Sequence, residues 1–128
     1  MGAWGVHFDE CDGALDFLGD VGDSRDWADV EHRLRDYIDN GGYDDAEEAL
    51  AAAELVAAGI GHPSLRLRPK LAAWAGEHRA DAERLRAGAV EATQLVLDAS
   101  ELSELWAEAD EGDEWRATVG ELLTRLRP

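Results

Sequence analysis

The fold is decided by residues 46–60, AEEALAAAELVAAGI. The apolar positions of this stretch alternate in steps of four and three residues, the spacing of one helix face, and they are Ala46, Leu50, Ala53, Ala57 and Ile60. Small alanine side chains on that face would let a second helix approach closely. Asp44 with Glu47 resembles a capping box at its start, and Gly59 is typical of its end. The sequence therefore predicts a helix over residues 45–59.

The same helical period continues on both sides of this stretch. We expect further helices over residues 13–21, 25–39, 101–109 and 114–126, and two over residues 69–99 that divide near 79–81. Gly22 is expected to end the first of these helices, and Asp23 and Ser24 to cap the next. Ser100 is the expected N-cap of the helix over 101–109, and Gly112 is expected to separate the last two helices.

Residues 1–12 lack the helical pattern. Trp4, Val6 and Phe8 alternate with Gly5 and His7, and a period of two is typical of extended backbone. We therefore expect an extended N-terminal arm that packs on the core. The chain as a whole, residues 1–128, is predicted to be a single all-α domain, a compact bundle of six to seven short helices.

The charge of the chain is strongly negative and uneven. The net charge is −17, with 15 acids and 3 bases in residues 1–50, 6 of each in residues 51–100, and 8 acids and 3 bases in residues 101–128. Nucleic acids and anionic membranes bind surfaces rich in lysine and arginine, so the composition argues against both as partners. The negative charge favours solubility, and it would favour binding of cations or of a basic protein partner.

The cysteine content and the hydropathy pattern indicate a cytoplasmic protein. Cys11 is the only cysteine, so an internal disulfide cannot form. No basic segment followed by an apolar run resembles a secretory signal at the start of the sequence. The most apolar stretch, residues 49–60, is too short to cross a bilayer.

Several segments spread over almost the whole chain carry a family resemblance: residues 1–5 (MGAWG), Phe8, 12–17 (DGALDF), 53–57 (AELVA), 61–64 (GHPS), 100–106 (SELSELW) and 114–116 (EWR). The chain resembles a bacterial family of uncharacterised proteins, domain of unknown function 4259. Cys11 stands where members usually have Asn, and His7 stands alone where they usually have a Gly-Pro or similar pair. The resemblance implies a small helical domain and no particular reaction.

Carboxylates gather near the N-terminus, and with the adjacent histidine they form a candidate binding site of His7, Asp9, Glu10, Asp12, Asp16 and Asp20. Asp12, Asp16 and Asp20 are spaced four apart, which puts them on one helix face where like charges repel. A hard cation with oxygen ligands would relieve that repulsion. The spacing departs from the EF-hand loop, because Cys11 and Gly13 stand at two of its ligand positions. The alternative is a solvated helix face.

Other chemical motifs are missing from the sequence. Carboxylates surround Cys11 and disfavour the thiolate that a nucleophile paired with His7 would need. The four histidines have no metal-binding spacing, and no serine stands in a Gly-x-Ser-x-Gly elbow. We therefore expect neither a cofactor nor a metal centre built on histidine or cysteine.

The five tryptophans divide into two groups. Trp27, Trp74 and Trp115 fall on predicted apolar stripes and are expected in the core. Trp4 and Trp106 are the candidates for a groove that receives a partner, since tryptophan is enriched at binding hot spots.

These observations leave the biochemical activity open and favour a non-catalytic role. The first hypothesis is an acidic interaction module that binds a basic protein, for example one that neutralises a toxin. The alternative is a small metal-dependent enzyme or cation-binding protein that uses the N-terminal carboxylates. A third hypothesis is a structural role through the alanine-rich helix, and we expect a monomer or a homodimer.

Overall fold

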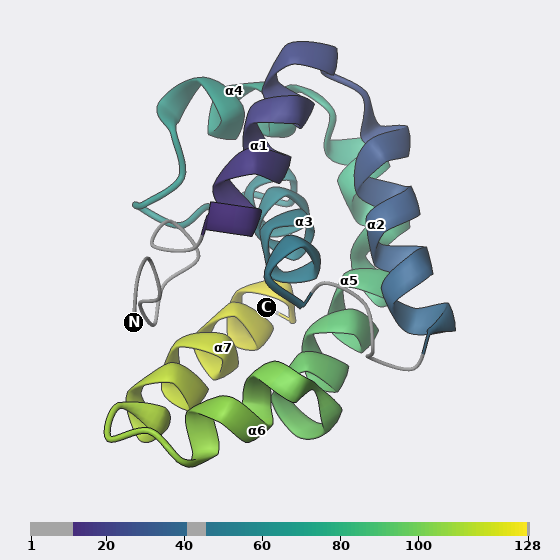
Figure 1. Ribbon diagram of the computed structural model, residues 1–128. Coiled ribbons are helices and arrows are strands. Elements are labelled where there is room, and N and C mark those ends of the chain that lie inside the picture. The colour runs from purple at the N-terminus through teal and green to yellow at the C-terminus, as the bar shows by residue number, and fades with distance from the viewer. Residues whose placement is uncertain (1–11, 41–45, 128) are drawn as a thin grey trace.

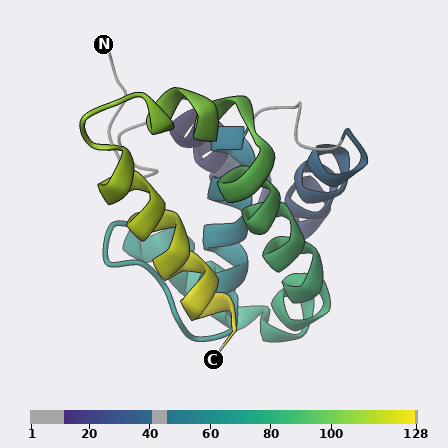
Figure 2. The same cartoon turned by 90° about the horizontal axis from the view of Figure 1, so that it is seen from below.

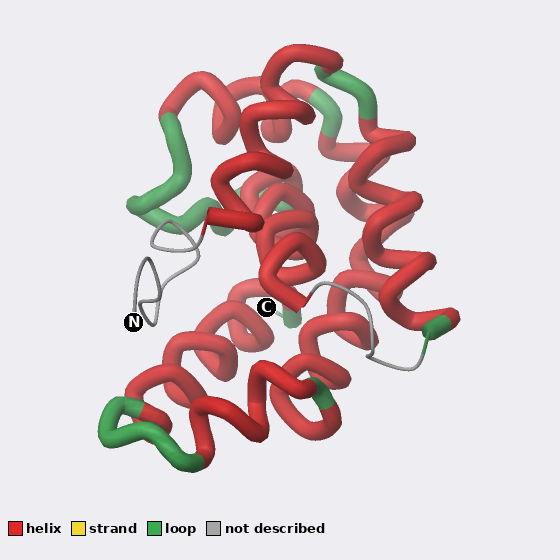
Figure 3. Tube along the Cα trace, viewed as in Figure 1, coloured by secondary structure: helices red, strands yellow, loops and turns green. Residues whose placement is uncertain are grey.

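The stretch at residues 46–60 forms the central helix of the structure, α3 (Ala46–Gly59). The computed structural model describes residues 12–40 and 46–127, which contain seven α-helices and no strand (Figures 1 and 3). The other six helices are α1 (Asp12–Ser24), α2 (Trp27–Asp39), α4 (Pro69–Glu77), α5 (Arg79–Ala99), α6 (Glu101–Ala107) and α7 (Gly112–Leu126). The prediction of an all-α bundle is confirmed for this part of the chain.

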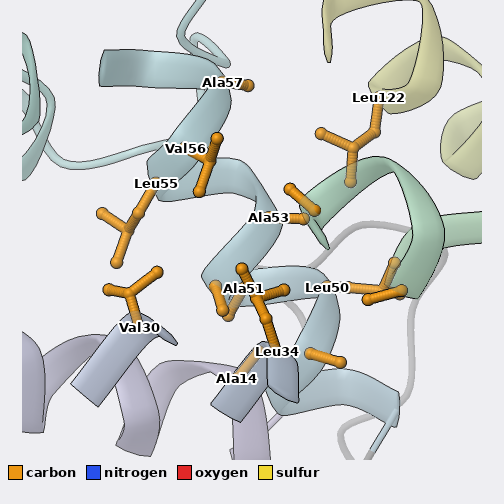
Figure 4. Close-up of a cluster of buried hydrophobic side chains, with 14 of the residues drawn as sticks. Ala14, Val30, Leu34, Leu50, Ala51, Ala53, Leu55, Val56, Ala57 and Leu122 are labelled. Atoms are coloured by element: carbon orange, nitrogen blue, oxygen red, sulfur yellow. The ribbon is translucent and has the colours of Figure 1, made fainter. Parts of the chain in front are cut away.

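Helix α3 is buried on all sides. Every residue from Ala49 to Gly59 is buried, and α1, α2, α4, α5 and α7 all contact this helix. Side chains from these neighbours surround it, including Val30 and Leu34 from α2 and Leu122 from α7 (Figure 4). A helix that is apolar around its whole circumference belongs in a core rather than on a surface.

Two helices approach each other closely at the end of α3. A Cβ atom added to Gly59 would overlap the Cβ of Ala82 on α5 and lie 3.3 Å from Cη2 of Trp27. Trp27 stacks in turn on Trp74 of α4, with ring centroids 4.9 Å apart and an interplanar angle of 19°. Because Gly59 has no side chain, α2, α4 and α5 can all approach α3 at this position.

The C-terminal pair, α6 and α7, is fixed by a cap and a second tryptophan stack. Ser100 caps α6 as predicted: its Oγ accepts a hydrogen bond of 2.9 Å from the backbone N–H of Ser103. The rings of Trp106 and Trp115 stack with centroids 6.2 Å apart and an interplanar angle of 7°. Both rings are buried, so α6 and the start of α7 are held against each other.

Three residues that were expected to end or cap a helix do not do so, and α6 ends at Ala107 rather than at residue 109. Helix α1 continues through Gly22 to Ser24, and the chain turns at Arg25, which has a φ of 51°. The N-cap of α2 is Asp26, whose carboxylate accepts from the N–H of Ala28 at 2.9 Å. Ser24 instead donates to a carboxylate oxygen of Asp29, at 2.7 Å.

The third of these residues lies at the start of α7. Gly112 is the first residue of that helix rather than a separator. A Cβ there would overlap the carbonyl oxygen of Trp106, so the position requires glycine. The arm at residues 1–11 and the capping residue Asp44 lie outside the described residues.

Among the residues described, no helix is both long and apolar enough to cross a membrane.

We predict opposite effects for alanine at two helical glycines. Gly59→Ala should destabilise the protein by about 1–3 kcal/mol, because the new methyl group overpacks the α3–α5 contact. Gly88→Ala, within α5 and with nothing within 4 Å of the new Cβ, should stabilise it by about 0.5–1 kcal/mol. Urea unfolding followed by circular dichroism at 222 nm measures both. Equal effects at the two positions would show that the close approach at Gly59 is not a constraint.

Candidate functional site

An unneutralised acidic surface covers the end of α6, the following turn and the start of α7. We call residues 104–114 the acidic turn; its carboxylates are all exposed and come from Glu104, Glu108, Asp110, Glu111, Asp113 and Glu114. Residues 101–115 contain no lysine or arginine. Within residues 12–40 and 46–127, no side chain forms an ion pair or hydrogen bond with any of these six carboxylates.

Several carboxylates of α2, α3 and α5 are bound by arginine. Glu31 of α2 accepts hydrogen bonds from Arg35 at 2.6 Å and from Arg84 of α5 at 3.0 Å. The hydrogen bond from Arg84 lowers the pKa of Glu31 below its ordinary value. Glu83 of α5 lies 3.4 Å from Arg79. Arginines thus pair with carboxylates of α2, α3 and α5, but none pairs with the acidic turn in the described structure. The carboxylates of the acidic turn therefore repel one another and would attract a cationic partner.

An exposed apolar side chain stands within the acidic turn. Leu105 is 52% exposed, whereas Leu102 and Trp106 of the same helix are buried. Its neighbours in sequence and one turn along the helix are Glu104 and Glu108. The surface therefore combines an apolar contact with surrounding negative charge, the composition expected for binding a basic and partly apolar surface.

A groove adjoins the acidic turn. It lies between α7 and the loop over residues 61–68, which run side by side in Figure 2, and has a volume of about 510 Å³. Its walls are formed by Glu54, Pro63, Ser64, Leu65, Arg66, Glu114, Ala117, Thr118, Glu121 and Arg125. Glu114 belongs both to the groove and to the acidic turn, so the two form one continuous surface.

A buried ion pair lies against this groove. The guanidinium of Arg125 on α7 donates to both carboxylate oxygens of Glu54 on α3, at 2.9 and 3.0 Å. Arg125 also donates to Glu121 at 2.6 Å and to the backbone oxygen of His62 at 3.2 Å. Burial lowers the pKa of Arg125, but the hydrogen bonds to Glu54 and Glu121 outweigh burial, and the net direction is upward. Arg125 therefore stays charged and ties α3, α7 and the loop together.

The loop beside the groove is ordered by hydrogen bonds and presents a leucine to solvent. Gly61 has a φ of 99°, and the N–H of His62 donates to the carbonyl of Ala57 at 2.9 Å, which closes the end of α3. The Oγ of Ser64 accepts from the N–H of Arg66 at 3.1 Å. Leu65, between them, is fully exposed.

The structure locates only part of the predicted N-terminal site. His7, Asp9, Glu10 and Trp4 lie outside the described residues, as does the side chain of Asp12. Asp16 and Asp20 are exposed on α1. The described residues contain no group of three side chains that could hold a metal ion. A cation site at the N-terminus therefore stays a prediction.

The second predicted groove residue, Trp106, is 7% exposed and packs on Trp115 beneath the acidic turn. The residues that line the observed groove were not expected from the sequence. The sequence does mark Glu54, because it is the one charged residue between Ala49 and Ile60. A charge inside an apolar stretch needs a partner when it is buried. Nothing in the sequence identifies Arg125, 71 residues further along the chain, as that partner.

A comparison with protein-family models finds that the model for the Domain of unknown function (DUF4259) matches residues 2–118. The chain belongs to the DUF4259 family. The DUF4259 match contains Glu54, the loop and the acidic turn, and it ends before Glu121 and Arg125. No curated protein and no solved structure matches the chain.

We predict strong coupling between Glu54 and Arg125. Glu54→Leu should cost about 3 kcal/mol, because it leaves a guanidinium that is mostly buried without its main partner. Glu54→Leu combined with Arg125→Met should recover most of that loss, since both charges are then removed. Arg35→Met, which breaks an exposed pair with Glu31, should have a much smaller effect on the free energy of unfolding. Chemical denaturation measures all three, and additive losses in the double variant would contradict the coupling.

The cation hypothesis for α1 has its own test. If Asp16 and Asp20 contribute to a site, calorimetry should detect Mg²⁺, Mn²⁺, Ca²⁺ or Zn²⁺ binding tighter than about 1 mM, and Asp16→Asn should weaken it. Glu91→Gln on α5 removes one exposed charge elsewhere and should leave the binding unchanged. Absence of binding heat for all four ions would remove the hypothesis.

Proposed function

We propose that this protein is a non-catalytic interaction module that binds a basic protein through the acidic turn. One observation carries the proposal: the acidic turn exposes six carboxylates that have no bound base in the described part of the chain, and the exposed side chain of Leu105 lies in the same segment, next to Glu104. A surface of one charge attracts a partner of the opposite charge and raises the rate of encounter.

The acidic turn is held rigidly, which favours binding. Ser100 caps α6, and the stack of Trp106 on Trp115 joins α6 to α7 directly beneath the exposed carboxylates. A rigid surface loses little conformational entropy when a partner docks, so more of the interaction energy contributes to affinity. Leu105 supplies an apolar contact that pure charge attraction lacks.

The class of partner follows from the charge and the small size of the chain. A net charge of −17 on 14.0 kDa suits a protein that covers a basic surface of another molecule. Neutralisation of a basic toxin is one role of this kind. The proposal uses no catalytic group and no cofactor, and it is open to either a monomer or a homodimer.

The test is capture of the partner from the native cell with two charge variants. The acidic-turn variant carries Glu→Gln at positions 104, 108, 111 and 114. The matched control carries Asp→Asn at positions 16, 20, 23 and 36, four exposed acids of α1 and α2. Wild type and control should retain the same basic protein at about 0.05 M salt and release it at about 0.5 M, whereas the acidic-turn variant should not retain it.

Two outcomes would contradict the proposal. One is that no basic protein is retained in a salt-dependent manner by wild type. The other is that both variants lose the partner equally, which would show that net charge alone, rather than the acidic turn, attracts it. Mass spectrometry identifies the retained protein, and its sequence shows whether it is basic.

A further inference from the structure

The α7 wall of the groove is a polar stripe. Glu114, Thr118, Glu121 and Arg125 follow one another at steps of four, three and four residues, so they share one helix face. Glu114 and Glu121 are two turns apart, about 10.5 Å along the axis, with Thr118 between them. A carboxylate on each side of Thr118 leaves a polar recess that opens toward the loop.

The loop wall is partly apolar, because Pro63 and Leu65 stand in it beside Ser64 and Arg66. Pro63 and Leu65 line the groove from the loop, and Ala117 adds a small apolar side chain from α7. The hydrogen bond from Arg125 to the carbonyl of His62 fixes the loop to α7. A ligand for this groove therefore needs an apolar part for one wall and a polar, charged end for the other.

The charge of the recess is negative. Glu54 and Arg125 bind each other through two hydrogen bonds and cancel. The Oε2 of Glu121 accepts a hydrogen bond from Arg125, and the side chain of Glu121 is still 59% exposed. Glu114 has no ion-pair partner in the described part of the chain. Two accessible carboxylates thus face the opening, against the single charge of Arg66 on the loop.

We propose that the groove binds one arginine side chain of the basic partner. The guanidinium lies between Glu114 and Glu121, and the aliphatic stem packs on Leu65. A planar guanidinium presents several donors that fit carboxylates, and its stem covers apolar surface, so arginine meets both walls better than lysine. This inference rests on the proposed function, because Glu114 joins the groove to the acidic turn.

The test uses two peptide probes that differ by one charge. The first is a lysine decamer with one central arginine, and the second carries citrulline, the uncharged isostere, at that position. Amide chemical shifts of the ¹⁵N-labelled protein are followed during titration. Both probes should shift Leu105, Glu108 and Glu111 in the acidic turn, but only the arginine probe should also shift Leu65, Ala117 and Thr118.

The affinities give a second readout. The arginine probe should bind roughly fivefold more tightly than the citrulline probe, the value of one exposed ion pair. In Glu114→Gln this ratio should fall toward one, and in Glu91→Gln, an exposed acid of α5, it should be kept. Shifts confined to the acidic turn with both probes would overturn the arginine site and leave the proposed function standing. Absence of shifts anywhere would overturn the proposed function itself.

Discussion

The burial of α3 on every side is the constraint on which the structure depends. Its residues from Ala49 to Gly59 are in contact with α1, α2, α4, α5 and α7, so no face of this helix is left for polar groups. Because most of these side chains are alanine, the surrounding helices approach closely, and even the position of Gly59 is filled by Ala82 and Trp27. Charge is thereby forced to the outside of the bundle, and among the acids whose side chains the structure describes only Glu54 is buried.

The exception, Glu54, connects the core to the surface. A buried carboxylate is costly unless it is paired, and the pairing with Arg125 satisfies it with two hydrogen bonds. The same guanidinium holds the loop at His62, which orders the wall of the groove. Arg125 therefore has two roles. It neutralises Glu54 in the core, and it holds in place the loop on which Leu65 is exposed.

The sequence predicts the fold better than the site, for a physical reason. Helical periodicity is local, so the stripes in α3 and its neighbours are visible in any short window. Helix ends are set by single residues that the period does not distinguish: Gly112 begins α7 where a Cβ would overlap Trp106, and Asp26 rather than Ser24 caps α2. The groove depends on a pairing across 71 residues, which no local pattern records. A charge inside an apolar stretch was the one available hint.

The acidic turn owes its free charge to the distribution of arginine along the chain. Residues 51–100 have equal numbers of acids and bases, and arginines of this segment reach across helices, as Arg84 of α5 does to Glu31 of α2. Residues 101–115 have no base of their own, and in the described structure no arginine from another helix reaches them. Like charges at this density are unfavourable to stability, and the proposed basic partner would supply the positive charge that the six carboxylates lack within the described structure. The exposed side chain of Leu105 and the stack of Trp106 on Trp115 belong to the same segment.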